Sequence, residues 1–164
     1  MRQIALLLLL VIAVKCSSPK NCFPSTYTLG LLYDHKVDRY QMHGLWVDSC
    51  CKNSSKLVAD YPFFCKNVTW EWEKLKPIWS NLTEMWYPHG DQGQQKNLME
   101  HEWLKHGSCT PYDILSFFKM SLCIREQFSP SVSEFCPNHK KDCSFPLEGK
   151  AKHIIDRCNL YFGC

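Results

Sequence analysis

The chain has 164 residues, of which 45% are hydrophobic, 13% aromatic and 21% charged, and its formal net charge is +3. This length allows one ordinary domain and excludes a large multidomain protein, while the composition is globular and excludes a disordered tail. The charge is too small for the whole surface to attract polyanions, so such binding would need a local cluster of residues.

The N-terminus has the pattern of a cleaved secretory signal. Arg2 is followed by an apolar run over residues 4–14, and then by Lys15 and small residues. A membrane-spanning helix needs about 20 apolar residues, so this run is too short to cross a bilayer. We interpret residues 1–17 as a signal peptide with an approximate cut, and a buried N-terminal helix is the alternative. The protein is then secreted, or held in the lumen of the secretory or lysosomal-vacuolar pathway, with no membrane span.

Cysteines and glycosylation triplets agree with this interpretation. The chain has 11 cysteines, and an even number remains if Cys16 leaves with the signal. Disulfides persist in oxidising compartments, but their pairing cannot be read from spacing. The triplets at Asn53, Asn67 and Asn81 are candidate sites of N-glycosylation.

The next part of the chain predicts two strands and an interrupted helix. Residues 25–33 and 39–47 are rich in aromatic and branched side chains and lie between turn-prone stretches, which indicates strands. From residue 72 to residue 86, large apolar side chains recur at steps of three and four, which is helical spacing. Pro77 must break or restart that helix because it lacks an amide proton.

The C-terminal half predicts one clear helix and a loop-rich tail. Asp113 is placed to cap a helix that ends before Pro130. Residues 137–164 have the character of a loop pinned by disulfides, with a strand at residues 153–162. We expect a single domain over residues 18–164.

Ionisable residues are concentrated in the segment 98–107 (LMEHEWLKHG), which we expect to be a helix ending at its glycine. Side chains four residues apart lie on the same face of a helix. His101 therefore lies next to Lys105, and Glu102 lies next to His106. This polar face is either a solvated side of the helix or a functional site, and the segment alone favours neither.

A zinc protease is the first alternative, because its motif also begins with His-Glu. That motif requires a second histidine four residues after the first, and this position holds Lys105. His101 and His106 are five residues apart, or about 140° around a helix, which is too divergent for one tetrahedral ion. We therefore expect no metal site here.

Cleavage of RNA through its own 2′-hydroxyl uses these residue types without a metal. A base must take the hydroxyl proton, an acid must protonate the leaving 5′-oxygen, and cations must stabilise the charge that develops on phosphorus. Histidines suit the acid and the base because the imidazole pKa is about 6.5. The partner group must come from another segment, and His43 is the obvious candidate, although a lone strand histidine is more often structural.

These segments carry a family resemblance. YQMHGLWVD at 40–48 resembles the first active-site segment of the ribonuclease T2 family, FTxHGLWPD, and HEWLKHGSC at 101–109 is similar to the second, HEWxKHGTC. YPFFC at 61–65 looks like the connecting region, and FPSTY at 23–27 is similar to the family's WPxTY. The resemblance covers roughly residues 20–125.

The resemblance implies a role for each matched residue. His106 would be the general base on the 2′-hydroxyl and His43 the general acid, with the roles reversed when the 2′,3′-cyclic phosphate is hydrolysed. His101 would bind phosphate, and Glu102 and Lys105 would stabilise the pentacovalent transition state. The expected fold is α+β, with an antiparallel sheet flanked by helices and held by disulfides.

The same resemblance implies the substrate contacts. Trp46 would stack on a base and Asp48 would accept a hydrogen bond from a base edge, so single-stranded RNA would be the substrate, with low base specificity. DNA lacks the 2′-hydroxyl and would not be cleaved. No cofactor is expected, the protein would be a monomer, and Cys65 would pair with Cys109.

Three positions depart from the family pattern. Val47 replaces a proline, Thr28 replaces a cysteine, and Met99 stands where a tryptophan is common. The part of the chain after Cys109 is also shorter than is usual in the family. These departures leave open a second class of function, a catalytically impaired, ribonuclease-like secreted protein that binds or is recognised by a partner.

Overall fold

A computed structural model describes residues 23–52, 56–58, 62–128, 132–136, 141–147 and 156–158. The predicted signal peptide and the glycosylation triplet at Asn53 lie outside these residues. None of the helices in these ranges is long and apolar enough to cross a membrane.

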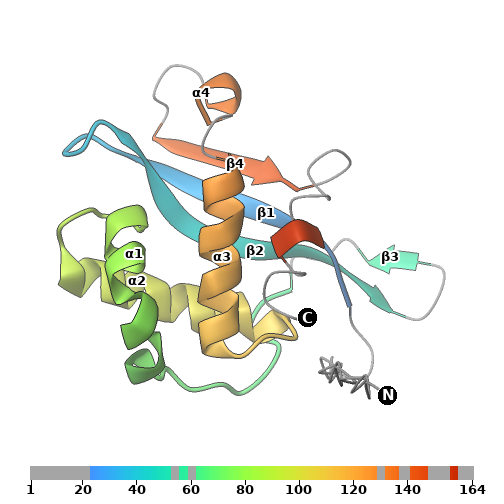
Figure 1. Cartoon of the computed structure of the whole chain (residues 1–164). Helices are drawn as coiled ribbons and strands as arrows, with labels where there is room; N and C mark the ends of the chain where they lie inside the picture. The colour runs from blue at the N-terminus through green and yellow to red at the C-terminus, as the bar shows by residue number, and fades with distance from the viewer. Residues whose placement is uncertain are drawn as a thin grey trace, which may run out of the picture.

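The centre of the fold is a four-stranded antiparallel sheet with strand order β3-β2-β1-β4 (Figure 1). Its strands are β1 (Phe23–Asp34), β2 (Arg39–Lys52), β3 (Lys56–Val58) and β4 (Asp142–Pro146). The two strands predicted from the sequence are therefore confirmed as β1 and β2, and both extend beyond their predicted ends. The predicted α+β class is also confirmed.

Helices cover one face of the sheet, as Figure 1 shows for α1, α2 and α3. The helical segments are η1 (Trp72–Ile78), α1 (Trp79–Met85), α2 (Gln92–Lys105), η2 (Gly107–Cys109), α3 (Ile114–Phe128) and α4 (Val132–Phe135). Trp86, Phe117 and Phe118 are fully buried in the core, with Leu29 and Leu31 of β1. Burial of large apolar side chains is the main stabilising contribution to such a fold.

Two local predictions for the helices are confirmed. Pro77 lies in the 3₁₀ helix η1, and a separate α-helix restarts at Trp79, because proline cannot donate the backbone hydrogen bond of a continuous helix. The carboxylate of Asp113 accepts a hydrogen bond from the backbone N–H of Ser116 at 2.7 Å, which is an N-cap contact for α3.

Helix α2 begins earlier than residue 98. Its N-cap is Asp91, whose carboxylate accepts hydrogen bonds from the backbone and the side-chain amide of Gln94, at 3.0 and 2.7 Å. The helix ends at Lys105, before Gly107, as predicted. That glycine is required by close packing, because a Cβ there would lie 2.3 Å from the ring of Trp103.

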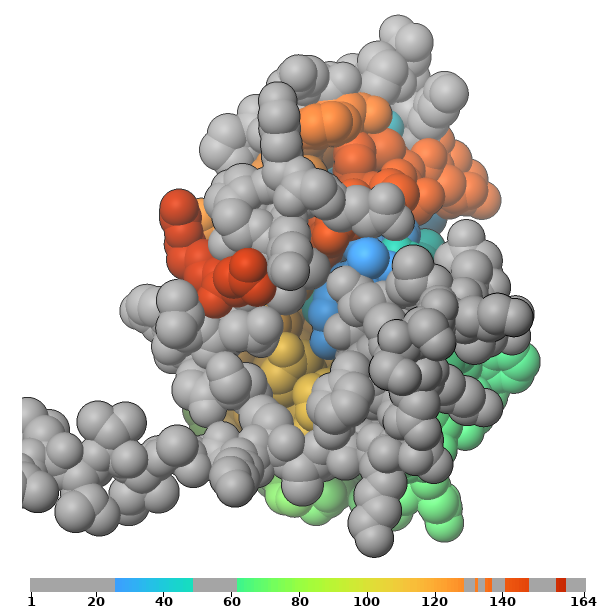
Figure 2. All heavy atoms as spheres, turned by 90° about the vertical axis from the view of Figure 1, so that its right-hand side faces the viewer, coloured from blue at the N-terminus to red at the C-terminus, as the bar shows by residue number. Residues whose placement is uncertain are grey.

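The predictions for the C-terminal part are wrong in two places. Residues 142–146 form strand β4, which pairs with β1, and Figure 2 shows orange-red atoms of β4 next to blue atoms of β1. Within the strand predicted at residues 153–162, residues 156–158 are helical, and the other positions lie outside the described residues. Two disulfides fix these short elements, Cys136–Cys143 and Cys123–Cys158. Because disulfides hold these short elements in place, they form without the apolar periodicity that the sequence prediction needed.

Candidate active site

Strand β2 presents His43 through a β-bulge. Leu31 of β1 pairs with Met42, and its neighbour Gly30 pairs with Gly44, so His43 is an extra residue in β2. A bulge redirects the side chain of the added residue, and such bulges are frequent beside active sites. The imidazole of His43 is 32% exposed, in a strand whose neighbouring Met42 is fully buried.

The sequence contained a signal for this bulge that the strand prediction did not use. The large apolar residues buried in β2 are Tyr40, Met42, Leu45 and Val47, so their alternation of period two is interrupted by one step of three. A regular strand would place Leu45 on the opposite face from Met42. The extra residue restores the apolar alternation and leaves His43 outside it.

A second irregularity in β2 lies at Asp48. Tyr27 pairs with Val47 and Thr26 pairs with Ser49, which leaves Asp48 as the added residue. The hydroxyl of Thr28 donates a hydrogen bond of 2.5 Å to the Asp48 carboxylate. Thr28, which was noted in the sequence only as a departure from the family pattern, therefore fixes the orientation of a predicted substrate-binding residue.

Glu102 joins helix α2 to strand β2. Its side chain is 2% exposed, and it accepts a hydrogen bond of 2.7 Å from the indole Nε1–H of Trp46. The Nε2 atom of His43 lies 3.6 Å from the other carboxylate oxygen. The buried carboxyl group of Glu102 thus lies against a second predicted catalytic residue, His43, and a predicted substrate-binding residue, Trp46.

Two glycines make this close approach of strand and helix sterically feasible. A Cβ at Gly44 would lie 2.0 Å from the Glu102 carboxylate and 2.6 Å from Nε1 of Trp46. A Cβ at Gly30 would lie 2.6 Å from the ring of Trp46. The glycine after His43 is therefore required by the space that Glu102 occupies.

His106 is far from His43 and Trp46 in the sequence. As the C-cap residue of α2, it nevertheless lies in the same cluster as these two side chains. Its ring centroid is 5.7 Å from that of Trp46, and the ring of His43 is 5.2 Å from Trp46. Burial, reinforced by the positive charges of Lys105, His101 and His43, lowers the pKa of His106 to about 4. The imidazole of His106 is therefore neutral at mildly acidic pH.

The pKa values of the other two groups shift in opposite directions. Burial lowers the pKa of His43, and the charges of His101 and Lys105 add to this, whereas Asp142 on β4 opposes it. Burial raises the pKa of Glu102 to about 7, although the Trp46 hydrogen bond and Lys105 favour its ionised form. Desolvation disfavours the charged state of each group, so the pKa of the carboxyl group rises while the pKa values of the two histidines fall.

His101 and Lys105 occupy the more exposed side of this end of α2. His101 is exposed and Lys105 is half-buried, and the charges of both act on His43 and His106. The structure therefore brings together His43, Trp46, Glu102 and His106 at the centre, with His101 and Lys105 beside them. Asp48 lies further along β2, against Thr28.

The segment before η1 is fastened to the end of α2. Cys65 and Cys109 form a disulfide, which is the pair that the resemblance implies. The backbone N–H of Phe64 donates to the carbonyl of Lys105 at 2.8 Å, and that of Cys65 donates to the Ser108 hydroxyl at 3.1 Å. These bonds fix the segment beside the residue that precedes His106.

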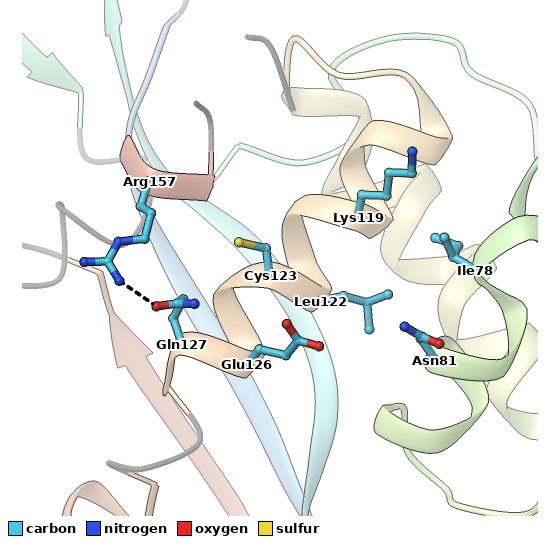
Figure 3. A pocket seen from close by; sticks show the side chains of 8 residues that line it. All are labelled: Ile78, Asn81, Lys119, Leu122, Cys123, Glu126, Gln127 and Arg157. Atoms are coloured by element: carbon cyan, nitrogen blue, oxygen red, sulfur yellow. Dashed lines mark hydrogen bonds between the residues drawn. The ribbon is translucent and has the colours of Figure 1, made fainter. Parts of the chain in front are cut away.

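A separate cavity of about 440 Å³ lies between α1 and α3 and contains none of these site residues. Figure 3 shows its lining, in which Asn81 and Ile78 face Leu122 and Arg157 donates to Gln127. Within the described ranges, no group of three or more His, Cys, Asp or Glu side chains is placed to hold a metal ion. The chemistry described above is therefore assigned to the histidine cluster and not to this cavity.

Comparisons with known proteins agree with the motif resemblance. The profile of the Ribonuclease T2 family matches residues 7–141. Ribonuclease Oy of Magallana gigas is 28% identical over 123 residues, which are 71% of this chain and 50% of that protein. Ribonuclease S-6 of Pyrus pyrifolia is 27% identical over 124 residues, which are 73% of this chain and 49% of that protein. The chain spans about half the length of these curated relatives.

Solved ribonuclease structures share the fold, among them that of a bitter gourd enzyme. A mutant of RNase MC1, a ribonuclease from bitter gourd seeds, was solved in complex with 5′-UMP and is 15% identical to this chain. The TM-score is 0.50, and the match covers 72% of this chain and 64% of that chain. At this identity the likeness shows the fold alone.

Proposed function

Because the chain belongs to the ribonuclease T2 family, we propose that it is a secreted endoribonuclease that cleaves single-stranded RNA by transphosphorylation, with low base specificity. The observation that carries this proposal is the convergence of His43, Glu102 and His106 around the ring of Trp46. In this arrangement, His43 from β2 and Glu102 and His106 from the end of α2 would face the same phosphodiester.

In this proposal His106 is the general base. Its lowered pKa keeps the imidazole neutral, so it can take the proton of the 2′-hydroxyl. The oxygen then attacks phosphorus, the bond to the 5′-oxygen breaks, and a 2′,3′-cyclic phosphate forms. Lys105 then stabilises the charge on the phosphoryl oxygens, and His101 binds the phosphate.

His43 is the general acid that protonates the leaving 5′-oxygen. It must carry a proton to do so, and its lowered pKa means that this form is abundant only at acidic pH. A neutral His106, together with the fraction of His43 that is protonated, supports activity in the acidic range. Hydrolysis of the cyclic phosphate reverses the roles.

Glu102 is proposed to act as a neutral carboxyl group at this pH. A carboxylate beside a phosphodiester would repel it, whereas a carboxyl group with a pKa of about 7 keeps its proton and can donate a hydrogen bond to a phosphoryl oxygen. Its proximity to Nε2 of His43 places that bond next to the proton donor. Trp46 holds the group in place through its indole N–H.

The remaining proposals concern substrate and cellular context. Asp48, oriented by Thr28, would contact a base edge, and DNA would not be cleaved because the attacking hydroxyl is missing. The disulfides support export to an oxidising compartment. Asn67 and Asn81 are exposed and remain candidate glycosylation sites. We propose a monomer that acts without a cofactor.

The test is digestion of single-stranded RNA in the presence of EDTA by the wild type and by His43→Ala and His106→Ala. The matched control is His35→Ala, because His35 is an exposed histidine in the turn between β1 and β2. We expect 2′,3′-cyclic phosphate ends from the wild type and the control, and none from the two site variants. Absence of cleavage by a folded wild type would instead favour a ribonuclease-like binding protein.

A further inference from the structure

The segment that precedes η1 exposes two adjacent aromatic rings. Phe63 is 62% exposed and Phe64 is 60% exposed, which is unusual for large apolar side chains. Their ring centroids are 6.1 Å apart, and the planes meet at 85° in an edge-to-face arrangement. This geometry leaves ring faces uncovered, because the two rings do not stack on each other.

The backbone holds these rings in a fixed place. Phe64 has a φ of +48°, in the left-handed region that side-chain-bearing residues rarely adopt. The conformation is maintained by the hydrogen bond from Phe64 to Lys105 and by the disulfide of the next residue, Cys65. Lys66 completes the attachment, since its Nζ donates to the carbonyl of Thr110 at 2.6 Å. Strained backbone maintained by several contacts is characteristic of functional sites.

The position of the rings relates them to the histidine cluster. The backbone N–H of Phe64 donates a hydrogen bond to the carbonyl of Lys105, the residue before His106. Phe63 and Phe64 therefore lie at the same end of α2 as the proposed general base. Trp46, the predicted stacking residue, is half-buried, with its N–H committed to Glu102 and its ring against both histidines. In the described part of the chain, Phe63 and Phe64 are the large exposed apolar side chains whose backbone is attached to this end of α2.

We propose that Phe63 and Phe64, here called the Phe63–Phe64 platform, form a stacking site for an unpaired base of the RNA strand beyond the nucleotides that flank the cleaved bond. Aromatic rings beside cationic side chains bind single strands with little base preference, because every base has a π-face. Lys66 and Lys105 provide the adjacent positive charge. This inference rests on the proposed ribonuclease function and adds that longer strands are the preferred substrate.

The experiment uses DNA strands that contain one ribonucleotide, so that only one bond can be cleaved and its position is known. A two-nucleotide substrate is compared with substrates extended on the 5′ side or on the 3′ side. The variants are Phe63→Ala and Phe63→Tyr, which keeps a ring. The matched control is Phe135→Ala, because Phe135 is 52% exposed on α4, away from this segment.

We expect extension on one side to raise kcat/KM of the wild type by about tenfold, as one stacked base would. Phe63→Ala should lose this gain and cleave the two-nucleotide substrate at the wild-type rate, while Phe63→Tyr and Phe135→Ala keep the gain. The proposal is overturned if Phe63→Ala retains the full gain, or if it slows the short and long substrates equally.

Binding separates this proposal from the proposed catalysis. Fluorescence anisotropy with an all-DNA strand needs no cleavage, and we expect weaker binding by Phe63→Ala than by Phe135→Ala. If the wild type cleaves no RNA, but Phe63→Ala still binds the strand more weakly than Phe135→Ala does, the Phe63–Phe64 platform is supported and the ribonuclease function is refuted. If Phe63→Ala leaves strand binding unchanged and abolishes self-association in sedimentation, the platform is a protein interface and the proposal is wrong.

Discussion

Replacement of Glu102 by glutamine should change how the stability of the protein depends on pH. The carboxyl group is buried, and burial raises its pKa from 4.5 to about 7. In the unfolded chain the same group ionises near 4.5. Between these two values the folded protein retains a proton that the unfolded chain has lost, so the free energy of unfolding falls as the pH rises.

The size of the effect follows from the difference between the two pKa values. Each pKa unit corresponds to about 1.4 kcal/mol, so ionisation of Glu102 should cost the folded state about 3 kcal/mol between about pH 4 and about pH 8. Glutamine has nearly the same shape, its oxygen can accept the Trp46 hydrogen bond, and it does not titrate. The stability of Glu102→Gln relative to the wild type should therefore increase by about 3 kcal/mol over this pH range.

Urea unfolding followed by tryptophan fluorescence, with disulfides intact, measures this difference at both pH values. Other titrating groups are shared by the two proteins and cancel in the comparison, except for His43, which lies 3.6 Å from the carboxylate. The same pair of measurements in a His43→Ala background removes that coupling. A stability difference that is equal at both pH values would refute the reasoning, because it would mean that Glu102 titrates near its ordinary pKa.

Three further predictions concern activity. The profile of kcat/KM against pH should rise through about 4, where His106 loses its proton, and fall through a value below 6.5, where His43 loses its own; a maximum above neutrality would contradict this assignment. Gly44→Ala should push the buried carboxyl group away from the indole N–H and lower kcat/KM by about tenfold, the effect of one lost hydrogen bond between neutral groups, with folding checked by circular dichroism. Thr28→Val should remove one hydrogen bond of the Asp48 carboxylate and alter the ranking of dinucleotide substrates while cleavage persists, and an unchanged ranking would exclude a role for this pair in base recognition.

The sequence predicted the elements whose side chains follow a regular period. Strands β1 and β2 are rich in aromatic and branched side chains between turns, and Asp113 supplied a recognisable cap for helix α3. The start of α2 was missed because its first two turns are polar, although Asp91 followed by Gln94 is a capping pattern. Strand β4 was missed because its position depends on disulfides and on pairing with β1, neither of which has a local signature.

The candidate site was predicted in its residues but not in its architecture. Motif resemblance pointed to His43, Glu102 and His106, and the structure places them in one cluster. Nothing local in the sequence indicated that Glu102 would be buried, since an exposed helix face fits the same spacing. The bond from Trp46 to Glu102 also depends on the packing of β2 against α2, which a linear pattern does not contain.

The extra residue in strand β2 is needed for the proposed catalysis but not for the packing of the strand, so one codon could be lost without loss of the fold. His43 stands outside the apolar alternation of β2, and Met42 and Gly44 already pair with consecutive residues of β1. Loss of this one codon would therefore remove this bulge and leave Tyr40, Met42, Leu45 and Val47 in unbroken alternation on one side of β2. We expect the shortened chain to fold like the parent and to lack the proposed general acid. Under the proposed function, a single in-frame deletion would thus convert a nuclease into an inert protein of the same fold.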